Sequence, residues 1–228
     1  ASEAKAVEIA LSNLARNCGF TDVTRLVWAA ETGLMQEFSA HFTPKTVEGT
    51  ELWLSVSADG KASISCTKNG KPLKALPAKL KKHAYVLELK EAEKNLREQY
   101  SRSKKMLEEA MEDAAPLLTH EVARLMEGNP VIAPLLKVLV FKSENGLGFY
   151  EGGALMAPDG MRTEVAGDAE LKIAHALDLY ESGTWAAYQA YLFEHEIKQP
   201  FKQVFRELYV KTADEHGKKT SLRYAGHQ

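Results

Sequence analysis

The chain has 228 residues, of which 45% are apolar and 26% charged, a composition typical of folded proteins and unlike that of disordered tails. Lys and Arg total 29 against 31 Asp and Glu, so the net charge of -2 gives no global reason to bind nucleic acid or an anionic membrane. No signal-peptide pattern and no apolar run of membrane-spanning length occurs, which predicts a cytoplasmic protein. The two cysteines, Cys18 and Cys66, support neither a disulfide framework nor a cysteine zinc site.

The amino-terminal residues have helical periodicity. Apolar residues of one stripe predict a helix over residues 3–17, and Cys18-Gly19 follows where a left-handed stop would fall. Thr21 or Asp22 can cap a second helix, which we expect to end near Gly33.

The apolar pattern then changes to alternation. Residues 52–56 and 62–66 read as two strands, and Ala58-Asp59-Gly60 between them reads as a hairpin turn. Asn69-Gly70 is a second turn signal that closes the hairpin region.

A long helix is expected over residues 84–114, because its apolar residues form one stripe and opposite charges stand four residues apart on its surface. Pro116 ends this helix, and a short helix over 119–126 and another after Pro130 follow. Glycine-rich turns then separate short strands near 139–141, 148–150, 154–156 and 163–165. Helical periodicity returns over residues 184–194 and again over 201–209.

These elements predict an α+β fold in which two small antiparallel sheets or hairpin regions are linked by one long helix, with helices at both ends. We expect residues 1–83 to hold the first helices, the hairpin and a lysine-rich loop, residues 84–118 to form the linking helix, and residues 119–228 to form an α+β lobe. The three parts pack as one compact unit or as two tightly packed lobes.

One candidate site is a run of lysines between Lys68 and Lys82 that contains no acidic residue. Six neutralised phosphates would give a salt-sensitive affinity for nucleic acid or another anionic partner. The alternative is that these are ordinary solvated lysines, since no aromatic residue is interleaved to stack bases. The run comprises Lys68, Lys71, Lys74, Lys79, Lys81 and Lys82.

A second candidate site lies in the segment Gln199-Pro200-Phe201-Lys202-Gln203. Pro200 suits the first turn of a helix, on which Gln203, Arg206 and Glu207 would share one side. Arg223 adds a guanidinium suited to a phosphate or carboxylate. The alternative is a structural network around buried aromatic residues.

The motifs of common enzyme classes are missing from the sequence. The segment from His195 to Gln199 is one residue from a zinc-protease pattern, but its last position is an amide. No phosphate-binding loop and no nucleophile elbow occurs. We therefore assign no catalytic residue, and we expect no cofactor and no metal.

The chain resembles the bacterial domain of unknown function numbered 4132. The resemblance rests on Gly70-Lys71-Pro72-Leu73-Lys74, on Ile173-Ala174-His175-Ala176-Leu177 and above all on Gln199-Pro200-Phe201-Lys202-Gln203 with Arg206-Glu207. Ala176 departs from the proline expected there. The family implies no catalytic residues. It implies a bacterial protein similar to a molybdate metabolism regulator, and a chain that is an excised domain or a short member of a family of longer proteins.

Two classes of function remain. The first is a non-catalytic binding or regulatory module of a larger bacterial protein, which contacts an anionic partner, such as nucleic acid, or other domains of the same protein, and no membrane. The second is an enzyme of unrecognised type, in which His175, Gln203, Arg206, Glu207 and Arg223 would converge in a cleft. The same residues, together with Gln199, are the candidates for binding a ligand or partner. We favour the first, because no pair of nucleophile and base is evident.

Overall fold

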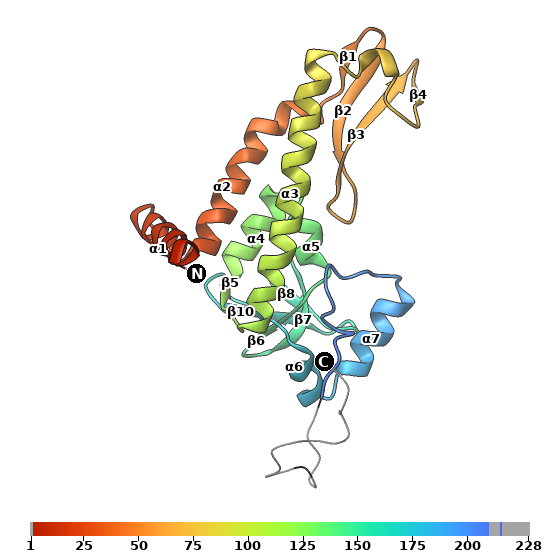
Figure 1. The fold of residues 1–228 in the computed structure, drawn as a ribbon. Helices are drawn as coiled ribbons and strands as arrows, with labels where there is room; N and C mark the ends of the chain where they lie inside the picture. Colours follow the sequence, from red (N-terminus) through yellow and green to blue (C-terminus); the bar gives the residue numbers. More distant parts are fainter. Residues whose placement is uncertain (1, 210–214, 216–228) are drawn as a thin grey trace.

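The structure, a computed structural model, describes residues 2–209 and residue 215. It confirms the α+β fold: within the described residues, seven α-helices accompany two small antiparallel sheets (Figure 1). One sheet lies beside the upper half of the longest helix, and the other lies around its lower half (Figure 1).

The upper sheet contains the predicted hairpin. Its order is β1 (Lys45–Val47), β2 (Thr50–Val56), β3 (Ala62–Lys68) and β4 (Lys71–Pro72), all antiparallel. Alternate residues of β2 and β3 are buried, so one face packs against the long helix and the other faces solvent. Two 3-10 turns, η1 (Ser39–Phe42) and η2 (Ala78–Leu80), flank the sheet in sequence.

Helix α3 (Ala84–Glu112) is the linking helix that the sequence predicts, and it takes part in two hydrophobic cores. Leu89 and Leu96 pack with the upper sheet, whereas Leu107 and Met111 pack with the lower one. Tyr100 contacts both cores at their junction. Opposite charges four residues apart pair on its surface as expected, for example Glu93 with Arg97 at 2.7 Å.

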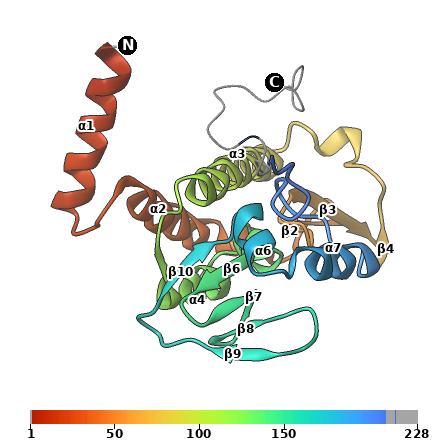
Figure 2. The same ribbon diagram turned by 90° about the horizontal axis from the view of Figure 1, so that it is seen from below.

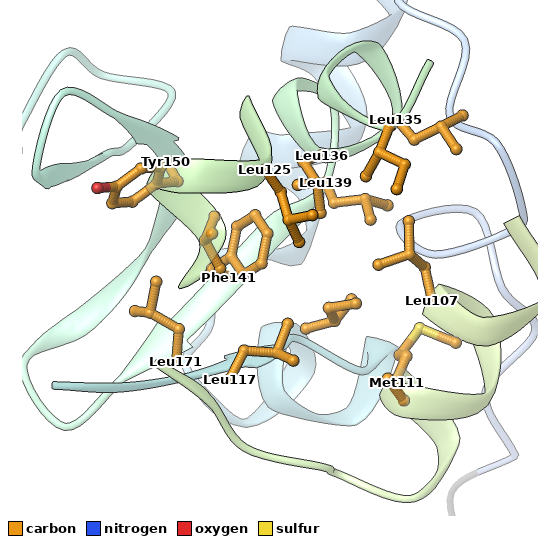
Figure 3. Packing of buried hydrophobic residues seen from close by; sticks show 14 of the residues in the cluster. Leu107, Met111, Leu117, Leu125, Leu135, Leu136, Leu139, Phe141, Tyr150 and Leu171 are labelled. Carbon is orange, nitrogen blue, oxygen red and sulfur yellow. The ribbon is translucent and has the colours of Figure 1, made fainter. Parts of the chain in front are cut away.

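The lower sheet has the order β5–β10–β6–β7–β8–β9 and is antiparallel throughout. Its residues contribute to the lower core together with α3 and the short helices that cover it (Figure 3). The strands are β5 (Leu117–Leu118), β6 (Val140–Ser143), β7 (Gly146–Glu151), β8 (Ala154–Met156), β9 (Arg162–Glu164) and β10 (Glu170–Ile173). The helices are α4 (Thr119–Gly128), α5 (Ala133–Lys137), α6 (Ala176–Glu181) and α7 (Trp185–Glu194).

The first two helices meet at a sharp corner. Helix α1 (Ser2–Asn17) ends at Gly19, whose φ of 80° confirms the predicted left-handed stop. Helix α2 (Val23–Phe38) begins at Asp22, whose side chain accepts a hydrogen bond from the Arg25 backbone N–H. The predicted end near Gly33 is wrong: Gly33 keeps a right-handed helical conformation, and α2 continues beyond it to Phe38.

The helix expected over residues 201–209 is also wrong. Residues 200–205 form bends and a turn, and residues 206–209 have no regular structure. A side-chain amide replaces one backbone hydrogen bond here: the Val204 N–H donates to Gln199 Oε1 at 3.0 Å instead of to a carbonyl one turn earlier. Phe201 and Val204 are buried in neighbouring hydrophobic clusters. Their burial holds the segment against the lower sheet and its helices, which together we call the lower lobe.

Candidate functional site

The six candidate lysines lie at the end of the upper sheet and in the chain that leads from it to α3; we call this group the lysine tip. Lys68 and Lys71 are direct partners across β3 and β4, on either side of Asn69-Gly70. Both turn residues have positive φ, 52° and 72°, which identifies a type I′ hairpin turn. In such a pair the two Cβ atoms lie about 5 Å apart, so two ammonium groups share a small region of surface.

All six lysines of the tip are exposed. Lys79 bonds to Glu48 at 2.9 Å, and this contact lowers the pKa of the Glu48 carboxyl. Within the described residues the other five form no ion pair: Lys68, Lys71, Lys74, Lys81 and Lys82. Helix α3 starts directly behind Lys82 and directs the positive end of its dipole toward the same region.

Gln203 occupies the core of the lower lobe and is 0% exposed. Its Nε2 donates to the carbonyls of Val140 and Ala174 at 2.7 and 2.8 Å. Its Oε1 accepts from the Val140 N–H at 2.9 Å and from Gln199 Nε2 at 2.7 Å. A glutamine amide has two donor and two acceptor positions, so Gln203 has none left for a ligand.

Gln199 is half-buried beside it. In addition to Gln203, its Nε2 donates to the Val138 carbonyl at 2.9 Å. Together the two amides attach the 199–204 segment to the start of β6 and to the residue that follows β10. The segment from Gln199 to Gln203, on which the family resemblance mainly rests, thus has a structural role in the fold.

Arg206 turns away from these amides and toward α3. Its guanidinium bonds to Glu112 at 2.5 Å and lies 3.7 Å from Glu108. Glu207 accepts a hydrogen bond from the Tyr209 hydroxyl at 2.5 Å. Arg223 lies outside the described residues. The described candidates of this segment therefore do not meet at one point: Gln199 and Gln203 are together, and Arg206 is on another side.

His175 caps helix α6. Its ring Nδ1 accepts a hydrogen bond from the Leu177 N–H at 3.2 Å, and its backbone N–H donates to the Asp178 carboxylate at 2.9 Å. His175 and Asp178 border a hollow of about 580 Å³ on the lower sheet, where Asp178 also pairs with Lys142. The charged lining combines both signs.

A second hollow, of about 850 Å³, lies between the lower half of α3 and the 197–206 segment. Sequence reasoning did not group three of its cations, Lys104, Lys198 and Lys202, which have no ion pair within the described chain and line the hollow together with the half-exposed Phe205. Lys198 and Lys202 stand four residues apart in the sequence, but Lys104 comes from a distant helix, so no local pattern could have grouped the three.

Within residues 2–209 no group of His, Cys, Asp and Glu is placed to hold a metal ion. None of the described helices is long and apolar enough to cross a membrane. Cys18 is exposed and Cys66 is buried, and both are free thiols. Burial raises the pKa of the Cys66 thiol, which is the opposite of what a reactive thiolate requires.

A family model described as Domain of unknown function (DUF4132) matches residues 70–228, which is more than half of the chain. The chain belongs to the DUF4132 family. The DUF4132 match includes the 199–207 segment and every lysine of the tip except Lys68. A second model, described as Family of unknown function (DUF5724), matches residues 1–30, which form α1 and the first half of α2. No curated protein and no solved structure matches the chain.

Proposed function

We propose that this DUF4132 protein is a non-catalytic binding module that holds a polyanion on its lysine tip, with the sugar-phosphate backbone of nucleic acid as the first candidate. The observation that carries the proposal is the direct cross-strand pairing of Lys68 with Lys71. Like charges directly opposite each other destabilise a β-ladder. A rigid hairpin that keeps two of them together is suited to an anion that neutralises both.

The residues around the Lys68–Lys71 pair also support binding of a polyanion. Three further lysines of the tip, Lys74, Lys81 and Lys82, are exposed and form no ion pair in the described chain. The upper sheet is rigidly attached to α3 through a buried core, so the hairpin presents its charges from a fixed support. Phosphate contacts of this kind position a polyanion without reading its sequence.

The binding test measures retention on heparin and fluorescence anisotropy with a labelled DNA duplex over a range of salt concentrations. The double variant Lys68→Gln with Lys71→Gln should lose affinity, and the slope of log K against log salt should become shallower by about 1.8, because two phosphate contacts are lost. A second variant, Lys71→Glu, should weaken binding while raising the free energy of unfolding by about 0.5 kcal/mol, because it creates an opposite-charge pair.

The matched control neutralises two exposed lysines of α3, Lys90→Gln with Lys94→Gln, which changes the net charge equally. This control should keep the wild-type slope. If both double variants lose affinity equally, the attraction is global and the lysine tip is not the site. If the wild-type protein passes through the heparin column at low salt, the proposal fails.

An enzyme of unrecognised type around residues 199–207 is the alternative proposal. It has less support, because Gln203 is fully hydrogen-bonded in the core and Arg206 is paired with Glu112. We further propose that the module is regulatory and acts in the bacterial cytoplasm as part of a larger protein. The proposal includes no role in molybdate metabolism, since only the naming of similar proteins points to one.

A further inference from the structure

Helix α1 stands apart from the rest of the molecule and touches it mainly through its corner with α2 (Figure 2). Of its described side chains only Ala15 is buried. Val7, Leu11 and Leu14 lie on one stripe and are 58%, 38% and 49% exposed. A helix of this length is marginally stable in water without packing. The stripe therefore requires a partner surface.

The corner keeps α1 from packing its stripe closely against its own chain: Val7 and Leu11 border an open hollow of about 550 Å³ that separates them from the first turn of α2. The Gly19 N–H donates to the Arg16 carbonyl at 3.0 Å and the Phe20 N–H to the Ala15 carbonyl at 2.8 Å, which together form a complete Schellman motif. Asp22 then caps α2. Thr21 is the single residue between the two caps, so the short connection restricts the direction of α1 relative to α2.

A second apolar surface lies on the other side of α2. A groove of about 330 Å³ runs between α2 and α4, and we call it the α2–α4 groove. Its apolar lining comprises Ala29 and Gly33, the corner residue Phe20, and the largely buried Trp28 and Leu125. Gly33 sits within a helix, where glycine is unfavourable, yet a Cβ built on it meets nothing within 4 Å. The fold itself gives no packing reason for this glycine. The close approach of another backbone does.

We propose that the α2–α4 groove receives helix α1 of a second copy of this chain, in a reciprocal exchange that closes as a two-fold dimer. The anchors Val7, Leu11 and Leu14 follow the i, i+4, i+7 spacing of helix-in-groove recognition. One chain carries both halves of the contact, and neither half can reach its counterpart within the same chain. Reciprocal docking covers both apolar surfaces and leaves no open end.

Charge complementarity supports this occupant. Glu3 and Glu8 flank the apolar stripe, four residues before Val7 and three before Leu11. Of the charged residues that line the groove, Arg25 and Glu121 pair with each other, whereas Arg124 is exposed and forms no ion pair within the described residues. Parallel stacking of two α1 stripes would instead bring the acidic flanks together. The inference is independent of the function proposed for the lysine tip.

The test is the mass of the whole chain by sedimentation and light scattering, with variants that block each half. Leu11→Glu disrupts the stripe, and Gly33→Leu places a side chain in the groove at a position where an added Cβ meets no atom within 4 Å in the monomer. Each variant alone should weaken self-association by at least about 100-fold. An equimolar mixture of the two should partly restore dimers, because the intact α1 of the Gly33→Leu chain can enter the intact groove of the other.

Ile9→Glu is the matched control. Ile9 is 53% exposed and lies two residues before Leu11, on the opposite side of the helix, so this variant should dimerise like the wild type. A monomeric wild-type chain at high concentration would overturn the proposal, even if α1 then binds another protein. A dimer that resists Gly33→Leu, or that Ile9→Glu dissolves as readily as Leu11→Glu does, would overturn it as well.

Discussion

Gln203 shows how one residue can hold a long segment in place. Its side-chain amide hydrogen-bonds to the N–H and the carbonyl of Val140 and to the carbonyl of Ala174, which lie on neighbouring parts of the lower lobe. We predict that Gln203→Leu lowers the free energy of unfolding by about 3 kcal/mol or more, because it leaves several buried backbone groups without partners. Urea denaturation measures this loss. The neighbouring exposed variant Lys202→Leu should stay within about 0.5 kcal/mol of wild type.

Glu31 is a buried acid between α2 and α3, 3% exposed, bonded to Arg102 at 3.0 Å and to Ser103 at 3.4 Å. Desolvation raises its pKa above the ordinary value of 4.5, and the hydrogen bond from Arg102 offsets only part of this effect. The folded protein therefore holds the Glu31 proton more tightly than the unfolded chain does. Its contribution to stability is complete below the unfolded pKa and is lost as pH rises through the folded one.

The corresponding prediction compares wild type with Glu31→Gln, which keeps the shape and cannot ionise. The unfolding free energy of the wild type relative to the variant should fall as pH rises from about 4.5 to about 7. Urea midpoints at several pH values check this trend. If the difference in unfolding free energy between the two proteins is constant with pH, or if the wild type becomes relatively more stable as pH rises, the raised pKa is contradicted.

Among the elements, the β2–β3 hairpin is attached to the lower lobe through its turn. Gly60 has a φ of 82°, and a Cβ there would lie 2.8 Å from the Val131 carbonyl and 3.3 Å from the Tyr100 ring. Gly60→Ala should cost the backbone strain of about 1 kcal/mol plus the displacement of these neighbours.

Gly70→Ala provides the matched comparison for Gly60→Ala. Its φ of 72° imposes similar backbone strain, but nothing lies within 4 Å of its Cβ. The difference between the two variants in thermal or urea denaturation thus isolates the contact between the lobes. Equal losses would show that the turn of β2 and β3 does not hold the lobes together.

At the scale of the whole molecule, two cores share one helix, and Tyr100 belongs to the boundary of both. We predict a single cooperative unfolding transition. Trp53 reports on the upper sheet and Trp28 on the lower core, so each tryptophan can be retained alone by replacing the others with Phe. In each variant, the fluorescence midpoint in urea should coincide with the midpoint of far-UV circular dichroism. Separate midpoints would mean that the lobes unfold independently.

Strong local signals explain what could be predicted from the sequence. Helix α3 has an uninterrupted stripe with charge pairs, and the β2–β3 hairpin has strict alternation with a turn between its strands, so both were predictable. Strands β5 and β10 are short and pair with partners far away in the sequence, so no local pattern reveals them. Gly33 misled because a glycine predicts a helix end only when its φ becomes positive, and here it does not.

The two candidate sites were likewise predictable only where a local sequence pattern marks them. The lysine tip follows from a contiguous run of charge, although the pairing of Lys68 with Lys71 depends on the register of β4. Gln199 and Gln203 were both named as candidate residues, but nothing in the sequence indicated that they bond to each other, as they do in the structure. Their partners Val138, Val140 and Ala174 come from other elements, and for that reason a helix with a polar side was the wrong expectation.

Helix α3 also has a mechanical consequence. With 29 residues it is a rod of about 44 Å that starts beside the lysine tip and ends at Glu112, the partner of Arg206. A rotation of such a rod by about 5° at one end displaces the other end by about 4 Å. This displacement is larger than the reach of a hydrogen bond. The lysine tip and the Arg206–Glu112 contact thus lie at opposite ends of one rod, so a small tilt of α3 at one end would produce a large displacement at the other.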